Sequence, residues 1–156
     1  MYSGNEQMFT MVDAHFENIT SFKTAPFVMI ENYLSNLDHI TVVNAHIGSS
    51  LFYFFKSSTV VLDWFNFQNI SKQQIEIDQL TEFESKFLLL GSCITLKRGM
   101  FFSLGNSNFI DIYSTAMYWD TEEIVAYGGE NYFIPERTGV KHITITLAHK
   151  ESITTE

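Results

Sequence analysis

The side chains best suited to nucleophilic or metal chemistry in this chain are one cysteine and five histidines. The cysteine, Cys93, lies in an apolar stretch between Leu90 and Ile94. A nucleophilic cysteine needs a nearby base and an electropositive setting that lowers its pKa, and an apolar strand favours neither. We therefore expect Cys93 to be a small buried residue. A single thiol also excludes an internal disulfide and a zinc site built from several cysteines.

The histidines show none of the tight spacings that are typical of zinc sites, such as HxH or HxxxH. His39 and His46 are seven positions apart, as are His142 and His149. In a strand, residues seven apart face opposite sides, so neither pair is a local chelate. The sequence therefore predicts no bound metal and no cofactor.

Two carboxylates stand inside apolar, strand-like segments, where paired acids would be able to do general acid–base work. Asp63 lies in the segment 60–65 and Asp111 in the segment 109–113. A buried carboxylate in such a place would have a raised pKa. We favour the simpler interpretation, in which both acids lie on the solvated side of a sheet. The alternative places both of them in a cavity inside the sheet.

The most informative feature of the sequence is the placement of charge. No Lys or Arg occurs between Arg98 and Arg137, and acids in this stretch are interleaved with tyrosine and tryptophan. Aromatic side chains anchor protein interfaces and carboxylates steer basic partners. The simpler alternative is an ordinary acidic surface over core aromatics. The residues predicted to bind a partner are Asp111, Tyr118, Trp119, Asp120, Glu122, Glu123, Tyr127, Glu130 and Tyr132.

Length and composition indicate one globular domain. The chain has 156 residues, of which 46% are hydrophobic and 17% charged, with a net charge of −9. That size suffices to bury a core without a staple, and such a composition argues against disorder. The acidity disfavours direct contact with nucleic acid or with an anionic membrane. We expect a single domain over 1–156, with flexible ends at 1–6 and 151–156.

Targeting signals are not evident. The first ten residues lack the basic and apolar regions of a signal peptide, and the longest apolar runs are far too short for a membrane helix. Two glycosylation-type triplets begin at Asn18 and Asn69, but such triplets are common by chance. A cytoplasmic, soluble protein is therefore expected.

Spacing in the first 37 residues favours helices. In 25–37, the apolar residues Phe27, Ile30, Leu34 and Leu37 recur at helical intervals, and Pro26 stands where helices often begin. Residues 7–20 also fit a short helix. No internal repeat is apparent.

The rest of the chain favours strands joined by short connections, which implies mainly antiparallel pairing. Segments 51–56 and 59–67 look like a hairpin. Lys97-Arg98-Gly99 is expected to be the turn of another, and 140–149 is the clearest strand. Residues 71–90 fit either a helix or a strand.

The predicted fold is α+β, with one or two N-terminal helices packed on a curved, mainly antiparallel and possibly barrel-like sheet of seven or eight strands. The predicted function is a non-enzymatic acidic protein that neutralises a basic protein partner. An immunity protein against a bacterial nuclease toxin is such a protein, because a nuclease must be basic to hold phosphate. The alternative is a small-molecule-binding or enzymatic β-barrel with an aromatic-lined cavity. Phe52, Phe54, Phe65, Phe101 and Phe102 would line that cavity, with Asp63, His46 or Tyr113 as polar anchors. Homo-oligomers are compatible with either.

Overall fold

The computed structural model describes residues 7–21, 25–72, 92–113, 115–128, 136–137 and 142–146, and within them every regular element is a strand. It contains no helix in this part of the chain that could cross a membrane. The strands are β1 (Met8–Ser21), β2 (Phe27–Ile30), β3 (Leu34–Ile47), β4 (Phe52–Phe55), β5 (Thr59–Lys72), β6 (Ser92–Gly105), β7 (Asn108–Tyr113), β8 (Thr115–Tyr127), β9 (Glu136–Arg137) and β10 (His142–Thr146).

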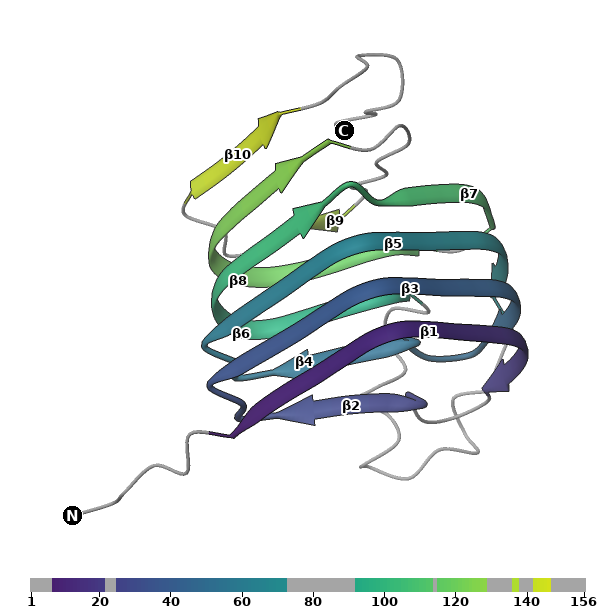
Figure 1. Cartoon of the computed structure of the whole chain (residues 1–156), viewed down its shortest axis with the longest axis horizontal. Coiled ribbons are helices and arrows are strands. Elements are labelled where there is room, and N and C mark those ends of the chain that lie inside the picture. The colour runs from purple at the N-terminus through teal and green to yellow at the C-terminus, as the bar shows by residue number, and fades with distance from the viewer. Residues whose placement is uncertain are drawn as a thin grey trace.

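All recorded strand pairings are parallel, and the chain winds as a β-solenoid (Figure 1). Met8 pairs with Leu34, and Leu34 pairs with Thr59, so one coil takes about 25 residues. Each coil rises by the spacing of neighbouring strands, about 4.8 Å. Residues that are far apart in sequence thus lie directly above one another.

Each full coil has three faces. The first face is made by the opening halves of β1, β3 and β5 together with the closing halves of β6 and β8, and β10 extends it. The second face is made by the closing halves of β1, β3 and β5, with β7. The third face is made by β2, β4 and the opening halves of β6 and β8, to which β9 is added.

Residues in the left-handed backbone region mark where the strands turn. One corner, between the first and second faces, carries this conformation in successive coils, at Asp13, His39, Trp64, Asn106 and Gly128. A second bend, within the second face, carries it at Asn18, Asn44, Asn69 and Asp111. A third corner, between the third and first faces, carries it at Glu31, Lys56 and Arg98. Asn and Asp tolerate this conformation better than most residues, which explains why they prevail at the second bend.

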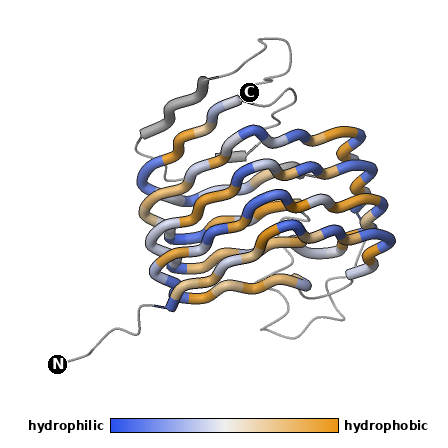
Figure 2. The backbone as a smooth tube through the Cα atoms, viewed as in Figure 1, coloured by the Kyte–Doolittle hydropathy of each residue, from blue (hydrophilic) through white to orange (hydrophobic). Residues whose placement is uncertain are grey.

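Inward-facing side chains fill the solenoid with apolar stacks. Hydrophobic and hydrophilic residues alternate along the coils (Figure 2). Phe52 contacts the rings of Phe27, Phe65 and Phe67, and Phe67 stacks on Phe109 with ring centroids 5.3 Å apart. Such columns of aligned side chains give a parallel solenoid its packed interior.

The first coil closes this core incompletely. Phe9, Met11, Phe16 and Phe27 point inward but are only partly buried, because no further coil in the described chain covers them. In the next coils the equivalent positions are almost fully buried. The core is therefore densest in the middle of the molecule.

The predicted α+β fold is wrong: the chain is all-β where described, and its strands are parallel rather than antiparallel. The helix predicted over 7–20 is strand β1, and the helix predicted over 25–37 spans β2 and the start of β3. The physical reason is the left-handed corner residue. It turns two consecutive side chains outward, so inward positions in β1 follow intervals of two and three, as at Met11, Ala14 and Phe16. The interval of three resembles helical spacing.

The predicted hairpins are also wrong, because short connections here turn corners rather than reverse the chain. β4 pairs with β2 and β6, not with β5, and Lys97-Arg98-Gly99 is a corner inside β6. The expected absence of a repeat is contradicted by the register between coils. The strand predicted over 140–149 corresponds to β10, whereas residues 73–91 lie outside the described part of the chain.

Candidate functional site

The corner between the first and second faces carries a concentration of acidic and aromatic side chains. We call it the acidic ridge, made of Asp13, Asp38, His39, Asp63, Trp64 and Tyr127. Asp38 and Asp63 are direct register partners on β3 and β5. Like charges on adjacent positions of neighbouring strands repel each other. The fold therefore places two carboxylate side chains at the same register position on neighbouring strands.

Asp63 is the most connected residue of the acidic ridge. Its Oδ1 accepts hydrogen bonds from the backbone N–H of Trp64 and from Nδ2 of Asn106, both at 3.0 Å. The hydroxyl of Tyr127 also donates to this carboxylate. A Cβ at Gly105 would lie 2.5 Å from both Asp63 Oδ1 and Tyr127 Cζ, so glycine leaves the room in which they meet. Asp63 is thus held in one orientation.

Asp38, His39 and Trp64 form the outer part of the ridge. Oδ1 of Asp38 lies 2.8 Å from Nδ1 of His39. The His39 ring stacks on Trp64, with centroids 5.7 Å apart and planes inclined by 17°. Trp64 is nevertheless 52% exposed. A large aromatic side chain that is ordered by a neighbour and still open to solvent is well suited to anchor a binding partner.

The pKa of the Tyr127 hydroxyl depends on its surroundings in the ridge. Burial raises the pKa of its hydroxyl above 10.0, and the charge of Asp63 raises that pKa further. The tyrosine therefore stays protonated at neutral pH and remains a donor to the carboxylate.

Basic side chains gather at the other edge of the first face. Lys56, Lys97 and Arg98 lie at the third corner, where Nζ of Lys56 is 3.0 Å from Oε1 of Glu31. Lys56 and Arg98 also lie over the ring of Phe55. Among the side chains that the structure describes, no Lys or Arg belongs to the acidic ridge. Glu31 and acids of β8 lie here as well, so the third corner carries both signs of charge.

The residues predicted to bind a partner do not form one patch. Trp119 is fully buried in the core, so its side chain is not available at the surface. Asp120 pairs in register with Lys97, and the exposed Glu122 and Glu123 follow it at the third corner. The half-buried Tyr118 lies on the third face, Asp111 lies on the second face, and Tyr127 belongs to the acidic ridge. Glu130 and Tyr132 lie outside the described residues.

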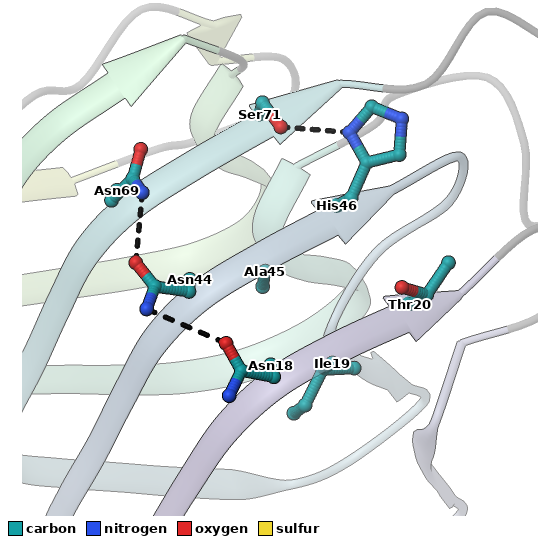
Figure 3. A pocket seen from close by; sticks show the side chains of 8 residues that line it. All are labelled: Asn18, Ile19, Thr20, Asn44, Ala45, His46, Asn69 and Ser71. Atoms are coloured by element: carbon teal, nitrogen blue, oxygen red, sulfur yellow. Dashed lines mark hydrogen bonds between the residues drawn. The ribbon is translucent and has the colours of Figure 1, made fainter.

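A second surface feature is a groove on the second face, which we call the polar groove (Figure 3). Its volume is about 290 Å³. One side is a ladder of amides, in which Asn69 donates to Asn44 at 2.8 Å and Asn44 donates to Asn18 at 3.5 Å. The groove is lined by Asn18, Ile19, Thr20, Asn44, Ala45, His46, Asn69 and Ser71.

The candidate reactive residues of the sequence are dispersed. Cys93 is completely buried, as expected. His39 lies on the acidic ridge, at the corner between the first and second faces, whereas His46 lies in the polar groove of the second face. The side chains of His142 and His149 are outside the described part. Within that part, no group of three His, Cys, Asp or Glu side chains could hold a metal ion.

Most of the phenylalanines that the alternative prediction places around a cavity fill the core instead. Phe52, Phe54, Phe65 and Phe102 are each 0–1% exposed, and Phe101 is half-buried on the outer side of β6. Asp63 and Asp111 both lie on the outer surface, on different faces, rather than together in a cavity. These positions favour a solid scaffold over an aromatic-lined barrel.

Sequence reasoning missed the acidic ridge and the polar groove because both are assembled across coils. The sequence did contain a signal for the polar groove. The two glycosylation-type triplets at Asn18 and Asn69, with Asn44-Ala45-His46 between them, are equivalent positions in three successive coils. A search for residues recurring at intervals of about 25 would have aligned them.

Comparisons with protein-family models, with curated proteins and with solved structures give no match to this chain.

Proposed function

We propose that the protein is a non-enzymatic binding protein whose acidic ridge engages a basic protein partner. The observation that carries this proposal is the in-register pair Asp38 and Asp63, flanked by the exposed Trp64, at a corner where no Lys or Arg side chain is described. A cationic group placed there would interact favourably with both carboxylates.

The chemistry of the ridge supports recognition rather than catalysis. The Asp63 carboxylate is already engaged by Trp64, Asn106 and Tyr127, which orient it as a fixed acceptor. Preorganised acceptors bind more tightly than mobile ones, because less ordering entropy is lost on binding. The net charge of −9 would steer a basic partner to the protein. A nuclease toxin, with its basic phosphate-binding surface, is a partner of this chemistry.

Either the acidic ridge or the acids of the third corner could bind the basic partner, and removing charge from each surface in turn tells the two apart. One variant removes two charges from the acidic ridge, by Asp38→Asn and Asp63→Asn. The other removes three charges from the third corner, by Asp120→Asn, Glu122→Gln and Glu123→Gln. The test measures binding of catalytically inactivated, basic nuclease toxin domains by calorimetry over a salt series. We expect the first variant to lose affinity and salt dependence and the second to change both little. The opposite result would move the interface to the third corner.

Trp64 provides an independent test, because its contribution does not depend on charge. Trp64→Asn removes the aromatic face but keeps a residue that tolerates the left-handed backbone at this position. An aromatic anchor contributes about 2 kcal/mol or more to binding, so affinity should fall about thirtyfold or more. Thermal unfolding serves as the control for folding. Unchanged affinity of a folded variant for a toxin domain that the native chain binds would refute the assigned ridge.

A further inference from the structure

The polar groove differs from the acidic ridge in its chemistry as well as in its place. Its lining contains amide, hydroxyl and imidazole groups and no Asp, Glu, Lys or Arg. Ala45 and Ile19 also line it, although their side chains pack in the core. An apolar ligand would find little hydrophobic surface here, and a phosphate would find no cation. The groove is suited to a neutral ligand with many hydroxyl groups.

The polar groups are arranged in two rows that cross the coils. Asn18, Asn44 and Asn69 form the first row. Thr20, His46 and Ser71 are register partners in the second row, and Nδ1 of His46 lies 2.7 Å from Oγ of Ser71 (Figure 3). The groove lies between the two rows.

These groups retain hydrogen-bonding capacity after their mutual contacts. Each amide can donate two hydrogen bonds and accept two, and the ladder takes at most one donor and one acceptor from each asparagine. The second ring nitrogen of His46 is likewise not used in its contact with Ser71. The groove therefore presents both donors and acceptors, which is what sugar hydroxyls need, since each of them also donates and accepts.

Both rows continue onto the next coil. Asp111 occupies the position that follows Asn69, and Tyr113 is the register partner of Ser71. Tyr113 is 69% exposed. Its ring has an open apolar face, of the kind that packs against the C–H face of a pyranose. The repeat of polar groups at about 4.8 Å along the coils suits a ligand that is itself a chain of similar units.

We propose that the polar groove binds a neutral glycan chain that runs across the coils, with the amide and hydroxyl rows bonding its hydroxyl groups and Tyr113 stacking on one sugar ring. This site is separate from the acidic ridge, because the two lie at different bends of the coil. It does not depend on the proposed function.

The test uses the full chain and a panel of neutral hexasaccharides, namely those of cellulose, xylan, mannan, amylose and laminarin. Saturation-transfer NMR detects binding, and titration gives the affinity. We expect at least one member to bind. His46→Ala and Tyr113→Ala should each weaken it about tenfold, as the loss of one good contact does. The matched control is His15→Ala, an exposed histidine of the second face that does not line the groove, and it should bind as the native chain does.

Two results with the neutral panel would overturn the proposal. One is the absence of binding by any member of the panel at millimolar concentration. The other is binding that His46→Ala and Tyr113→Ala leave unchanged while both variants keep native thermal unfolding. A charged glycan, such as polygalacturonate, completes the panel, and preferential binding of that probe would also contradict a neutral site. Binding of toxin domains by the ridge can fail without affecting any of these readouts.

Discussion

At the scale of the residue, the properties of a side chain in this protein depend on its contacts with side chains of the neighbouring coils. Asp63 would be an ordinary exposed carboxylate on an isolated strand. In the solenoid it meets the hydroxyl of Tyr127 above Gly105 and the amide of Asn106. These contacts come from two other segments of the chain, the end of β6 and the end of β8. The same stacking places the Asp38 carboxylate in register with Asp63.

The pKa of Tyr127 gives a prediction at this scale. Asp63→Asn removes the negative charge that helps to raise this pKa, so the tyrosine should ionise at lower pH than in the native chain, although burial still keeps the pKa above its ordinary value. The difference in tyrosinate absorbance between each protein and its Tyr127→Phe counterpart isolates this hydroxyl. An unchanged titration would show that Asp63 does not act on it.

The sign of the accompanying stability change follows from the raised pKa. Because the folded state holds the Tyr127 proton more tightly than the unfolded state, its contribution to stability is complete below pH 10.0 and is lost as pH rises through the higher folded-state pKa. Tyr127→Phe should reduce this alkaline loss. Denaturant unfolding at successive pH values above neutrality measures it.

At the scale of the element, the left-handed corner residues decide where each strand bends. Asn44 has a φ of 57°, and the equivalent Asn18 and Asn69 have φ of 57° and 54°. An asparagine at such a position adopts the conformation at low cost and uses its amide to bond the next coil. The bend and the ladder therefore have the same origin in residue type.

Substitutions at Asn44 should separate these two contributions. Asn44→Gly removes the amide but permits the left-handed backbone, whereas Asn44→Val removes the amide and imposes strain on a β-branched residue. We expect the valine variant to be less stable than the glycine variant by about 1–2 kcal/mol. Urea unfolding of the two variants provides the comparison, and equal stabilities would mean that this bend does not require the left-handed conformation.

At the scale of the whole molecule, stability should vary along the solenoid axis, because each coil contacts only its neighbours. Phe67 is completely buried and contacts three other phenylalanines. Phe16 is its register-aligned counterpart in the first coil and is only partly buried. The middle coils therefore carry most of the packing energy.

A pair of truncations tests this gradient. Phe67→Ala should cost about 3–5 kcal/mol, as is usual for a fully buried phenylalanine. Phe16→Ala should cost clearly less, because part of its ring is already in contact with water. Both free energies come from denaturant unfolding. Equal losses would imply that the first coil is covered in solution, for example by a second copy of the chain.

The sequence by itself determined composition, acidity, the burial of Cys93, and the strand character of most segments after residue 38, since these depend on residue type and local alternation. The sequence did not determine which strands pair with one another. Corner residues such as Asp13 interrupt the alternation and produce intervals that resemble a helix, and parallel hydrogen bonds join residues about 25 positions apart, beyond the reach of local patterns. Tertiary structure alone brought Asp38 to Asp63, Asn18 to Asn44, and His46 to Ser71. Both candidate surfaces exist because a solenoid stacks equivalent positions, so that its binding chemistry lies between coils rather than within any one of them.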